Sequence, residues 1–355
     1  MPPRRTVKSM IMRTRSPVIL DLLLPGLFDR LAEWNASYAE TPDAPILSGR
    51  LGKAGRNRQP GRGFERTLCA LLDPGADSDA EPPLGCWLSG LDGAVVCCAE
   101  PVHLKPGISD LVLVDSAQLR LEDDEAALLE QQVDEYLRPV GGRFVYRDGM
   151  GFLGFEQAPP LRSWSSSEVA GRGIQARLPG GEDSAWWHRL LNELQMLMYD
   201  SALNRLREER GKAPVSGLWL WGGGERRPRP EGRYDAAIAD GGLAERLLRQ
   251  CGVPVVDGIE AALTQAVPGG GRILWVWRGL QAAAQYDDYA AWREQLRRLD
   301  ERLGQVLRSD LSCHDWRINL ISDGWRFEIR PRQAWRFWRR SRSLTDLAAE
   351  GAARD

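Results

Sequence analysis

The sequence predicts an α/β fold in which a mostly parallel sheet carries helices on both faces and a smaller α/β domain is inserted. Short, fully apolar runs such as LWLW at residues 218–221 are typical of strands covered on both faces. Several of these runs alternate with segments whose apolar residues have helical spacing. A chain of 355 residues can also bury a large core and form more than one domain.

The composition excludes several classes of protein. The 47 basic and 49 acidic residues nearly cancel, so no overall field attracts nucleic acid or a membrane. The six cysteines form no CxxC pair, which is typical of buried thiols in a reducing compartment, and three histidines limit metal chemistry. The basic N-terminus lacks the apolar segment of a signal peptide, and no long apolar run occurs. We expect a cytoplasmic protein without a cofactor.

The first half of the chain begins with a basic stretch, residues 1–16, that is expected to be a disordered tail. VILDLLL at residues 18–24 is the first predicted strand, and Pro25-Gly26 ends it before a helix over residues 27–34. The glycine-rich residues 48–66 are expected to form a mobile loop. The next predicted elements are a helical turn at 68–72, strands at 86–88, 94–99 and 111–114, a helix at 123–137, and a hairpin of strands at 144–146 and 151–155 across Asp148-Gly149.

The second half opens with a long loop at residues 159–182, which is expected to be functional, an interface or loosely ordered. Further predicted helices cover 184–210, 242–250, 259–266 and 287–308, and further strands cover 218–221, 236–239, 253–256, 273–277 and 317–322. We expect residues 17–104 and 201–340 to form the core domain, residues 105–200 to form the inserted domain, and residues 341–355 to be a second disordered tail.

The stretch GLWLWGGG at residues 217–224 is the predicted centre of the ligand site. Ligands of open α/β sheets bind at the carboxyl ends of the strands, and here a strand ends on Gly222, Gly223 and Gly224. Glycines let backbone amides approach an anion. The preceding polar residues suit a phosphate or carboxylate ligand; they are Asn204, Arg207 and Lys212. The alternative is that these residues only cap their own helix.

Residues 325–340 are rich in tryptophan and arginine, the residues that dominate interface anchors. This composition is typical of a surface that stacks single-stranded bases, and equally of a terminal segment that directs its arginines away from a sheet. The predicted interaction surface consists of Trp335, Arg336, Trp338, Arg339 and Arg340.

LNRLREERGKAPVSGLWLWGGG at residues 203–224 resembles a stretch of archaeal-type, cofactor-independent phosphoglycerate mutases of the alkaline-phosphatase superfamily. VILDLLLPG and RINLISDG resemble that family's strands ending in Asp-Gly and Asp-His. The resemblance implies an alkaline-phosphatase-like core split by an inserted domain. LLLPGL, EPVHL, LLNELQMLMYD and FWRR also resemble a set of proteobacterial proteins labelled phosphoglycerate mutase-like or regulatory. Genes of that set often lie near a DNA-repair exonuclease gene, which implies this exonuclease as a candidate protein partner.

The chain departs from the resembled family at the positions that hold two divalent metals. The Asp-Gly falls on Pro25-Gly26, the Asp-x-x-x-His falls on LQAAAQY at 280–286, and the Asp-His falls on Asp323-Gly324, which keeps one carboxylate. We therefore expect a catalytically degenerate protein, without catalytic or metal-binding residues, that has a binding or regulatory role. Its ligand, an anionic small molecule, would lie beside Asp323 and the glycines. The alternatives are a mutase- or phosphatase-type enzyme with a non-standard site in this cleft, and an accessory protein associated with single-stranded nucleic acid.

Overall fold

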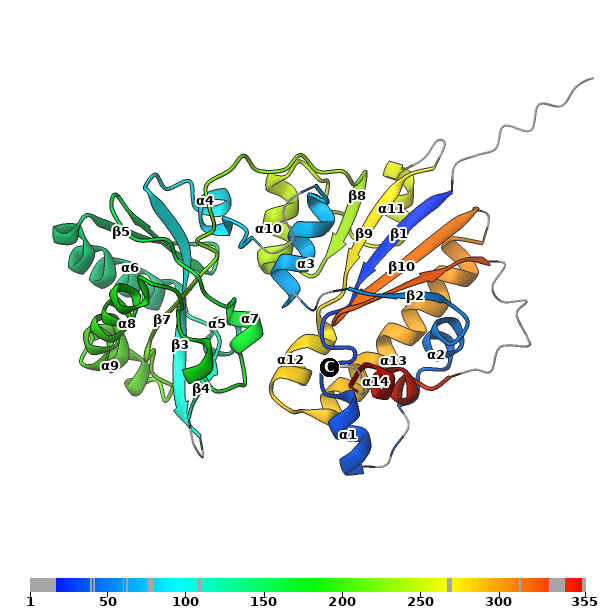
Figure 1. Ribbon diagram of the computed structural model, residues 1–355, viewed down its shortest axis with the longest axis horizontal. Coiled ribbons are helices and arrows are strands. Elements are labelled where there is room, and N and C mark those ends of the chain that lie inside the picture. The colour runs from blue at the N-terminus through cyan, green and yellow to red at the C-terminus, as the bar shows by residue number, and fades with distance from the viewer. Residues whose placement is uncertain are drawn as a thin grey trace, which may run out of the picture.

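The computed structural model describes residues 17–38, 40, 42–59, 61, 63–75, 80–107, 110–266, 270–312, 314–331 and 342–352. Within these ranges the chain forms two sheets, one mostly parallel and one antiparallel, each with its own helices (Figure 1). The predicted α/β fold class is confirmed.

The mostly parallel sheet has β1 at its centre. In the described part of the chain its order is β2-β11-β10-β1-β9-β8. Its strands are β1 (Val18–Leu23), β2 (Gly55–Arg58), β8 (Ala236–Ala239), β9 (Arg272–Val276), β10 (Trp316–Ser322) and β11 (Trp325–Ile329). β1 pairs in parallel with both β9 and β10, whereas β11 and β2 continue the sheet in antiparallel pairing. The carboxyl ends of β1, β9 and β10 therefore meet at one edge.

Helices cover both faces of this sheet because its central strands carry apolar residues on both faces. Leu20 and Leu22 enter one core, whereas Leu23 enters a second core on the other face. The first core is covered by α1 (Leu31–Tyr38), α2 (Pro45–Leu51), α11 (Ile259–Ala266), α12 (Gly279–Gln285), α13 (Tyr289–Gln305), its π-helical continuation (Val306–Asp310) and α14 (Leu344–Ala352). The second core is covered by α3 (Gly63–Leu72), α4 (Leu84–Ser89) and α10 (Gly242–Gln250).

The antiparallel sheet lies on the opposite side of α3, α4 and α10 (Figure 1). Its strands are β3 (Val95–Pro106), β4 (Leu111–Val114), β5 (Gly142–Arg147), β6 (Met150–Phe155) and β7 (Gly217–Trp221). A third core holds α6 (Asp123–Leu137), α8 (Ser184–Tyr199) and α9 (Ala202–Glu209) against its outer face. The shorter helical segments are α5 (Ser116–Leu119), Arg138–Val140, α7 (Ser166–Val169) and Gln175–Arg177. The hairpin turn is confirmed at Asp148-Gly149, where both residues have positive φ.

The strand predicted at residues 218–221 is present as β7, but the prediction that it belongs to the parallel sheet is wrong. β7 pairs antiparallel with β3 in the second sheet. Its two faces are both apolar because Leu218 and Leu220 enter the third core while Trp219 and Trp221 enter the second. Since β3 and β7 share one sheet, the second unit begins before residue 105 and extends past residue 200, unlike the expected domain boundaries.

Three local predictions are corrected by tertiary context. Residues 86–88 lie in helix α4, because their apolar side chains pack on one side of a short helix rather than in a sheet. The segment 48–66, expected to be a loop, contains the end of α2, β2 and the start of α3. The helix predicted at 184–210 is broken: Ser201 caps α9 by accepting a hydrogen bond from the Asn204 amide at 3.0 Å.

The C-terminal prediction is also corrected. Residues 344–352, expected to be disordered, form α14, because Leu344 and Leu347 are buried in the first core. Residues 1–16 and the predicted interaction surface lie outside the described residues, so their roles stay predictions. That surface consists of Trp335, Arg336, Trp338, Arg339 and Arg340. Among the described helices, none has both the length and the apolar character needed to span a bilayer.

Candidate functional site

Two adjoining cavities of about 310 and 170 Å³ lie at the carboxyl edge of the parallel sheet, and together they are called the edge cleft. Both cavities are lined by Pro25, Asp29, Phe64, Arg172 and Asp323. The edge cleft therefore joins the ends of β1 and β10 to α3 and to the loop that precedes α8. This is the edge at which open α/β sheets bind ligands.

Asp323 follows β10 and ties the ends of the two central strands together. Its Oδ1 accepts a hydrogen bond from the Gly26 amide at 3.1 Å, and its Oδ2 accepts from the Phe28 amide at 2.8 Å. The Ser322 hydroxyl donates to Oδ2 at 2.7 Å. Burial raises the pKa of Asp323, against these donors, which favour the charged form. Both oxygens of this carboxylate are thus used to close the loop after β1.

Two glutamines on α12 face the edge cleft with the spacing of one helical turn. Gln281 and Gln285 are both buried and line its smaller cavity. Arg278 donates from Nε to Gln281 Oε1 at 2.8 Å, and Gln285 donates from Nε2 to the Ser167 carbonyl at 2.5 Å. Gly26 allows the loop after β1 to approach this helix, since a Cβ there would lie 2.9 Å from Gln281 Cα. This wall of the cleft is polar but uncharged.

Arginines from the loop between β6 and α8 form the opposite wall. Arg172 Nη2 lies 2.8 Å from each carboxylate oxygen of Asp29, so an ion pair joins this loop to the segment after β1. Arg177 donates to the Gly173 carbonyl at 3.0 Å, and within the described part of the chain its guanidinium has no carboxylate partner. Trp164 also lines the cleft and is 47% exposed. This wall combines two arginines and the carboxyl group of Glu168 with an accessible aromatic ring.

Sequence reasoning missed most of these lining residues. Asp29, Arg172 and Arg177 carry no local motif, although the loop at residues 159–182, which holds the two arginines, had been expected to be functional, an interface or loosely ordered. Gln281 and Gln285 are four residues apart, a spacing that places two side chains on one face of a helix, but no helix was predicted for LQAAAQY.

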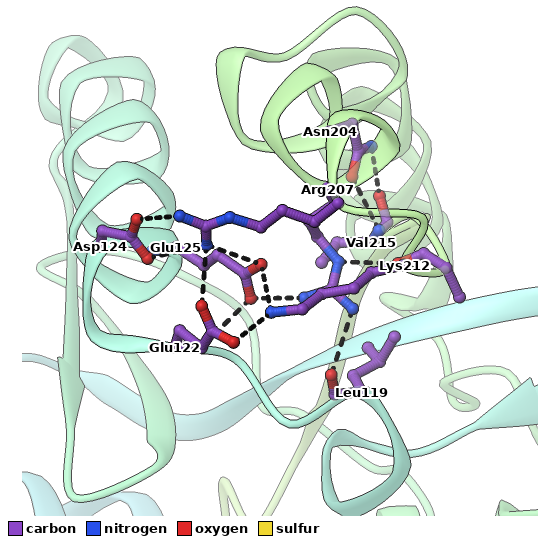
Figure 2. Close-up of polar contacts among 10 residues, drawn as sticks. Leu119, Glu122, Asp124, Glu125, Asn204, Arg207, Lys212 and Val215 are labelled. Atoms are coloured by element: carbon purple, nitrogen blue, oxygen red, sulfur yellow. Dashed lines mark hydrogen bonds and ion pairs between the residues drawn. The ribbon is translucent and has the colours of Figure 1, made fainter.

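Asn204, Arg207 and Lys212 lie together on the far side of the antiparallel sheet, and none of them lines the edge cleft. Figure 2 shows Arg207 and Lys212 directed at the first turn of α6. Arg207 is buried and donates to Glu125 Oε2 at 2.6 Å, and Lys212 lies 2.9 Å from Glu125 Oε1. Asn204 holds the loop before β7 by accepting from the Val215 amide at 2.8 Å. The prediction that these residues share a cleft with Asp323 is wrong, because Arg207 and Lys212 pair with the internal carboxylate of Glu125 and Asn204 bonds the backbone.

Gly222, Gly223 and Gly224 also lie away from the edge cleft, packed against the segment before α4. The Gly222 amide donates to Glu81 Oε1 at 2.7 Å. A Cβ on Gly224 would lie 1.7 Å from the Glu81 carbonyl oxygen. Glu81 therefore occupies the place that had been predicted for an anionic ligand, and the glycines are required for close packing. Of the predicted ligand residues, Asp323 is the one that lines the edge cleft.

The residues at the edge do not fit the two-metal cluster implied by the resemblance. Such a cluster needs several charged ligands for each ion. At the corresponding positions the chain places Pro25, Gln281, Gln285 and one carboxylate, Asp323, whose two oxygens already accept three hydrogen bonds. Among the described residues, no group of three or more His, Cys, Asp or Glu side chains could hold a metal ion.

Comparison with known proteins places this geometry in a family context. No family model matches the chain. A protein of Geobacter sulfurreducens, described as a probable 2,3-bisphosphoglycerate-independent phosphoglycerate mutase, is 25% identical over 249 residues. The chain is similar to cofactor-independent phosphoglycerate mutases. This phosphoglycerate mutase-like match covers 65% of the chain but spans only 60% of the length of the Geobacter protein.

Solved structures extend the likeness to the fold. The PH0037 protein from Pyrococcus horikoshii matches with a TM-score of 0.50 and 14% identity, covering 90% of this chain and 92% of that chain. A cofactor-independent phosphoglycerate mutase from Thermoplasma acidophilum matches with a TM-score of 0.36 and 15% identity, covering 89% and 90%. The Pyrococcus structure shows that the phosphoglycerate mutase-like chain shares its fold with a known protein.

The Arg207–Glu125 pair generates a prediction about stability. Burial opposes the charge on Glu125, but hydrogen bonds from Lys212 and from the Glu122 amide outweigh it and hold its pKa below the usual value. Arg207→Met leaves this buried carboxylate short of a partner, so chemical denaturation should show a loss of about 3 kcal/mol. The matched Arg205→Met removes an exposed pair with Asp200 and should cost less than about 1 kcal/mol. Equal losses in the free energy of unfolding for the two variants would contradict the role of Arg207 as the partner of a buried carboxylate.

A second buried carboxylate, Glu100 on β3, lies between the antiparallel sheet and the cleft. It accepts hydrogen bonds from Trp221 Nε1 at 3.1 Å and from the Ser116 hydroxyl at 3.1 Å. Burial is the main cause that raises its pKa from 4.5 to about 7, and the charges of Asp115 and Glu65 act in the same direction. A carboxyl with a raised pKa stabilises the folded state while it is protonated. Its contribution is present at low pH and is lost as the pH rises through about 7.

We therefore predict that the free energy of unfolding falls between about pH 5 and about pH 8, with Glu100 contributing at most about 3 kcal/mol. Glu100→Gln should reduce this slope, because its amide stays neutral and the Ser116 hydroxyl can turn to accept from it. The exposed Glu156→Gln should keep the wild-type slope. Denaturant titrations across this range test the prediction, which fails if Glu100→Gln and wild type run parallel.

Proposed function

We propose that this protein is a catalytically degenerate relative of cofactor-independent phosphoglycerate mutases that has a binding or regulatory role in the cytoplasm. The observation that carries the proposal is the set of side chains at the carboxyl edge of the parallel sheet. Where the resemblance implies charged metal ligands, the chain has Pro25, two buried glutamines, and Asp323 with both oxygens engaged by the loop after β1. A protein partner belongs to the same proposal, and the gene context of the resembled proteobacterial set supports a DNA-repair exonuclease.

The edge cleft supports binding of an anionic small molecule. Arg177 supplies a guanidinium that donates only to the Gly173 carbonyl among the described residues, so its remaining N–H groups can reach a phosphate or carboxylate. The exposed face of Trp164 offers stacking area beside it. Gln281 and Gln285 add neutral amide groups that fix orientation without repelling an anion. Asp29 neutralises Arg172, which leaves Arg177 as the main source of attraction.

A specific contact favours a second candidate, an enzyme of mutase or phosphatase type that works without metal at a non-standard site. The Ser167 hydroxyl lines the edge cleft and donates to Glu65 Oε2 at 2.6 Å. Glu65 is 5% exposed and also accepts from Ser165 at 2.8 Å. A hydroxyl bonded to a carboxylate is the arrangement of a nucleophile with its general base. The second hydrogen bond from Ser165 weakens Glu65 as a base, so we place this candidate second.

The first experiment measures metal content and turnover. After chelation and reloading with Mn²⁺, elemental analysis should find well below one ion per chain, because one engaged carboxylate cannot replace several ligands. Phosphoglycerate and p-nitrophenyl phosphate should not turn over above buffer. Stoichiometric Mn²⁺ that is lost in Asp323→Ala would contradict the proposal. Metal-independent turnover that is abolished by Ser167→Ala would instead establish the second candidate.

The second experiment tests anion binding in the edge cleft by thermal unfolding with 3-phosphoglycerate and inorganic phosphate. A ligand at about 100 times its Kd stabilises the native state by about 2.7 kcal/mol, so the unfolding midpoint should rise. Arg177→Gln should remove most of the rise. Arg162→Gln, an exposed arginine in the same loop, should keep it. The absence of any rise, or an equal loss in both variants, would argue against an anion site beside Arg177.

A further inference from the structure

A separate cavity of about 300 Å³ lies at the opposite side of the first core and shares no lining residue with the edge cleft. It is enclosed by α2, by the π-helical residues Val306–Asp310 that continue α13, and by the end of β11. Its lining combines four apolar side chains with three cationic ones. The apolar residues are Pro45, Ile46, Leu307 and Ile329, and the cationic residues are Arg50, Lys53 and Arg308.

Two backbone features shape this cavity. The π-helical turn places Leu307 and Arg308 on its wall, and such turns occur often at functional sites. Gly304 lets α13 approach α2, since a Cβ there would lie 2.4 Å from Ile46 Cδ1 and 3.1 Å from an Nη atom of Arg308. Gly49 faces open space instead, with no atom within 4 Å of the Cβ that it lacks. The cavity is therefore kept open on the α2 side.

Two of the three cations around the cavity, Arg50 and Arg308, face no acidic residue among the described residues that line it. Within the described residues, neither Arg50 nor Arg308 makes a side-chain hydrogen bond or ion pair, and none of the lining residues is acidic. Burial lowers the pKa of Arg50, because its half-buried guanidinium has lost water without gaining a partner. The nearby carboxylate of Asp300 is buried and accepts from the Leu47 amide at 2.6 Å. Like charges gathered beside an apolar surface are stabilised by an anion that also buries apolar area.

We propose that this cavity binds an organic anion with an apolar body. The anionic group lies between Arg50, Arg308 and Lys53, whose guanidinium and ammonium groups suit a phosphate or carboxylate. The apolar body packs on Ile46, Leu307 and Ile329. The lining therefore favours a ligand that has both an anionic group and an apolar body. Inorganic phosphate offers only the anionic group, and a neutral aromatic compound offers only the apolar body.

The test uses calorimetric titration of the full chain with phenyl phosphate, inorganic phosphate and phenol. Phenyl phosphate should bind at least about tenfold more tightly than either of the other two, because only it satisfies both halves of the lining. Arg50→Gln combined with Arg308→Gln should weaken it by about tenfold or more. Gly49→Leu should block it by filling the open space, and leucine in place of glycine favours the helix that must remain folded.

Two control variants locate the binding. Arg298→Gln removes an exposed arginine of α13 that pairs with Glu294 at 2.8 Å, and it should leave phenyl phosphate binding unchanged. Arg177→Gln removes the contribution of the anion site proposed in the edge cleft, and the binding that remains in this variant should be the part that the Arg50 and Arg308 changes weaken. The proposal is overturned if phenyl phosphate and inorganic phosphate bind equally, if Gly49→Leu retains binding, or if Arg177→Gln removes it while the Arg50 and Arg308 changes do not.

Discussion

The parallel pairing of β1 with both β9 and β10 is the constraint on which the rest of the structure depends. β1 is apolar except for Asp21, and this buried carboxylate accepts from Tyr234 at 2.8 Å, Asn319 at 2.6 Å and Arg272 at 2.9 Å. Its neighbours come from distant parts of the chain, and between β2 and β8 the chain leaves this sheet and returns to it. The second sheet forms within that excursion, and the carboxyl ends of the central strands meet at the edge cleft.

At this edge the Asp323 side chain has a structural role. The negative charge of a buried carboxylate must be compensated by a cation or by hydrogen-bond donors. Here the donors are the Gly26 and Phe28 amides and the Ser322 hydroxyl. These three hydrogen bonds occupy most of the roughly four lone pairs of the carboxylate, so closing the loop after β1 and holding an ion at Asp323 are competing uses of one side chain. The two glutamines on α12 place neutral side chains at the same edge.

In the second unit, the charge of a buried carboxylate is compensated by internal ion pairs. Glu125 at the start of α6 is contacted by Arg207, Arg210 and Lys212, all from the segment that leads into β7 (Figure 2). Glu81 similarly accepts a hydrogen bond from the Gly222 amide at the other end of that strand. Groups that look like anion receptors in the sequence are therefore satisfied within the fold. Among the described residues, cations without such partners lie elsewhere, at Arg177 in the edge cleft and at Arg50 and Arg308 beside α2.

The sequence by itself determined the elements whose signals are local. The apolar run of β1, the helical spacing of α6 and the turn at Asp148-Gly149 were all readable, because each depends on neighbours a few residues away. Only the tertiary structure decided that β7 joins β3, and that β2 lies beside β11. A strand that is apolar on both faces is compatible with a parallel or an antiparallel neighbour, and residue spacing does not choose between them. The same limit hid Arg172 and Arg177, which reach the cleft through a long irregular loop whose path depends on packing between the two sheets.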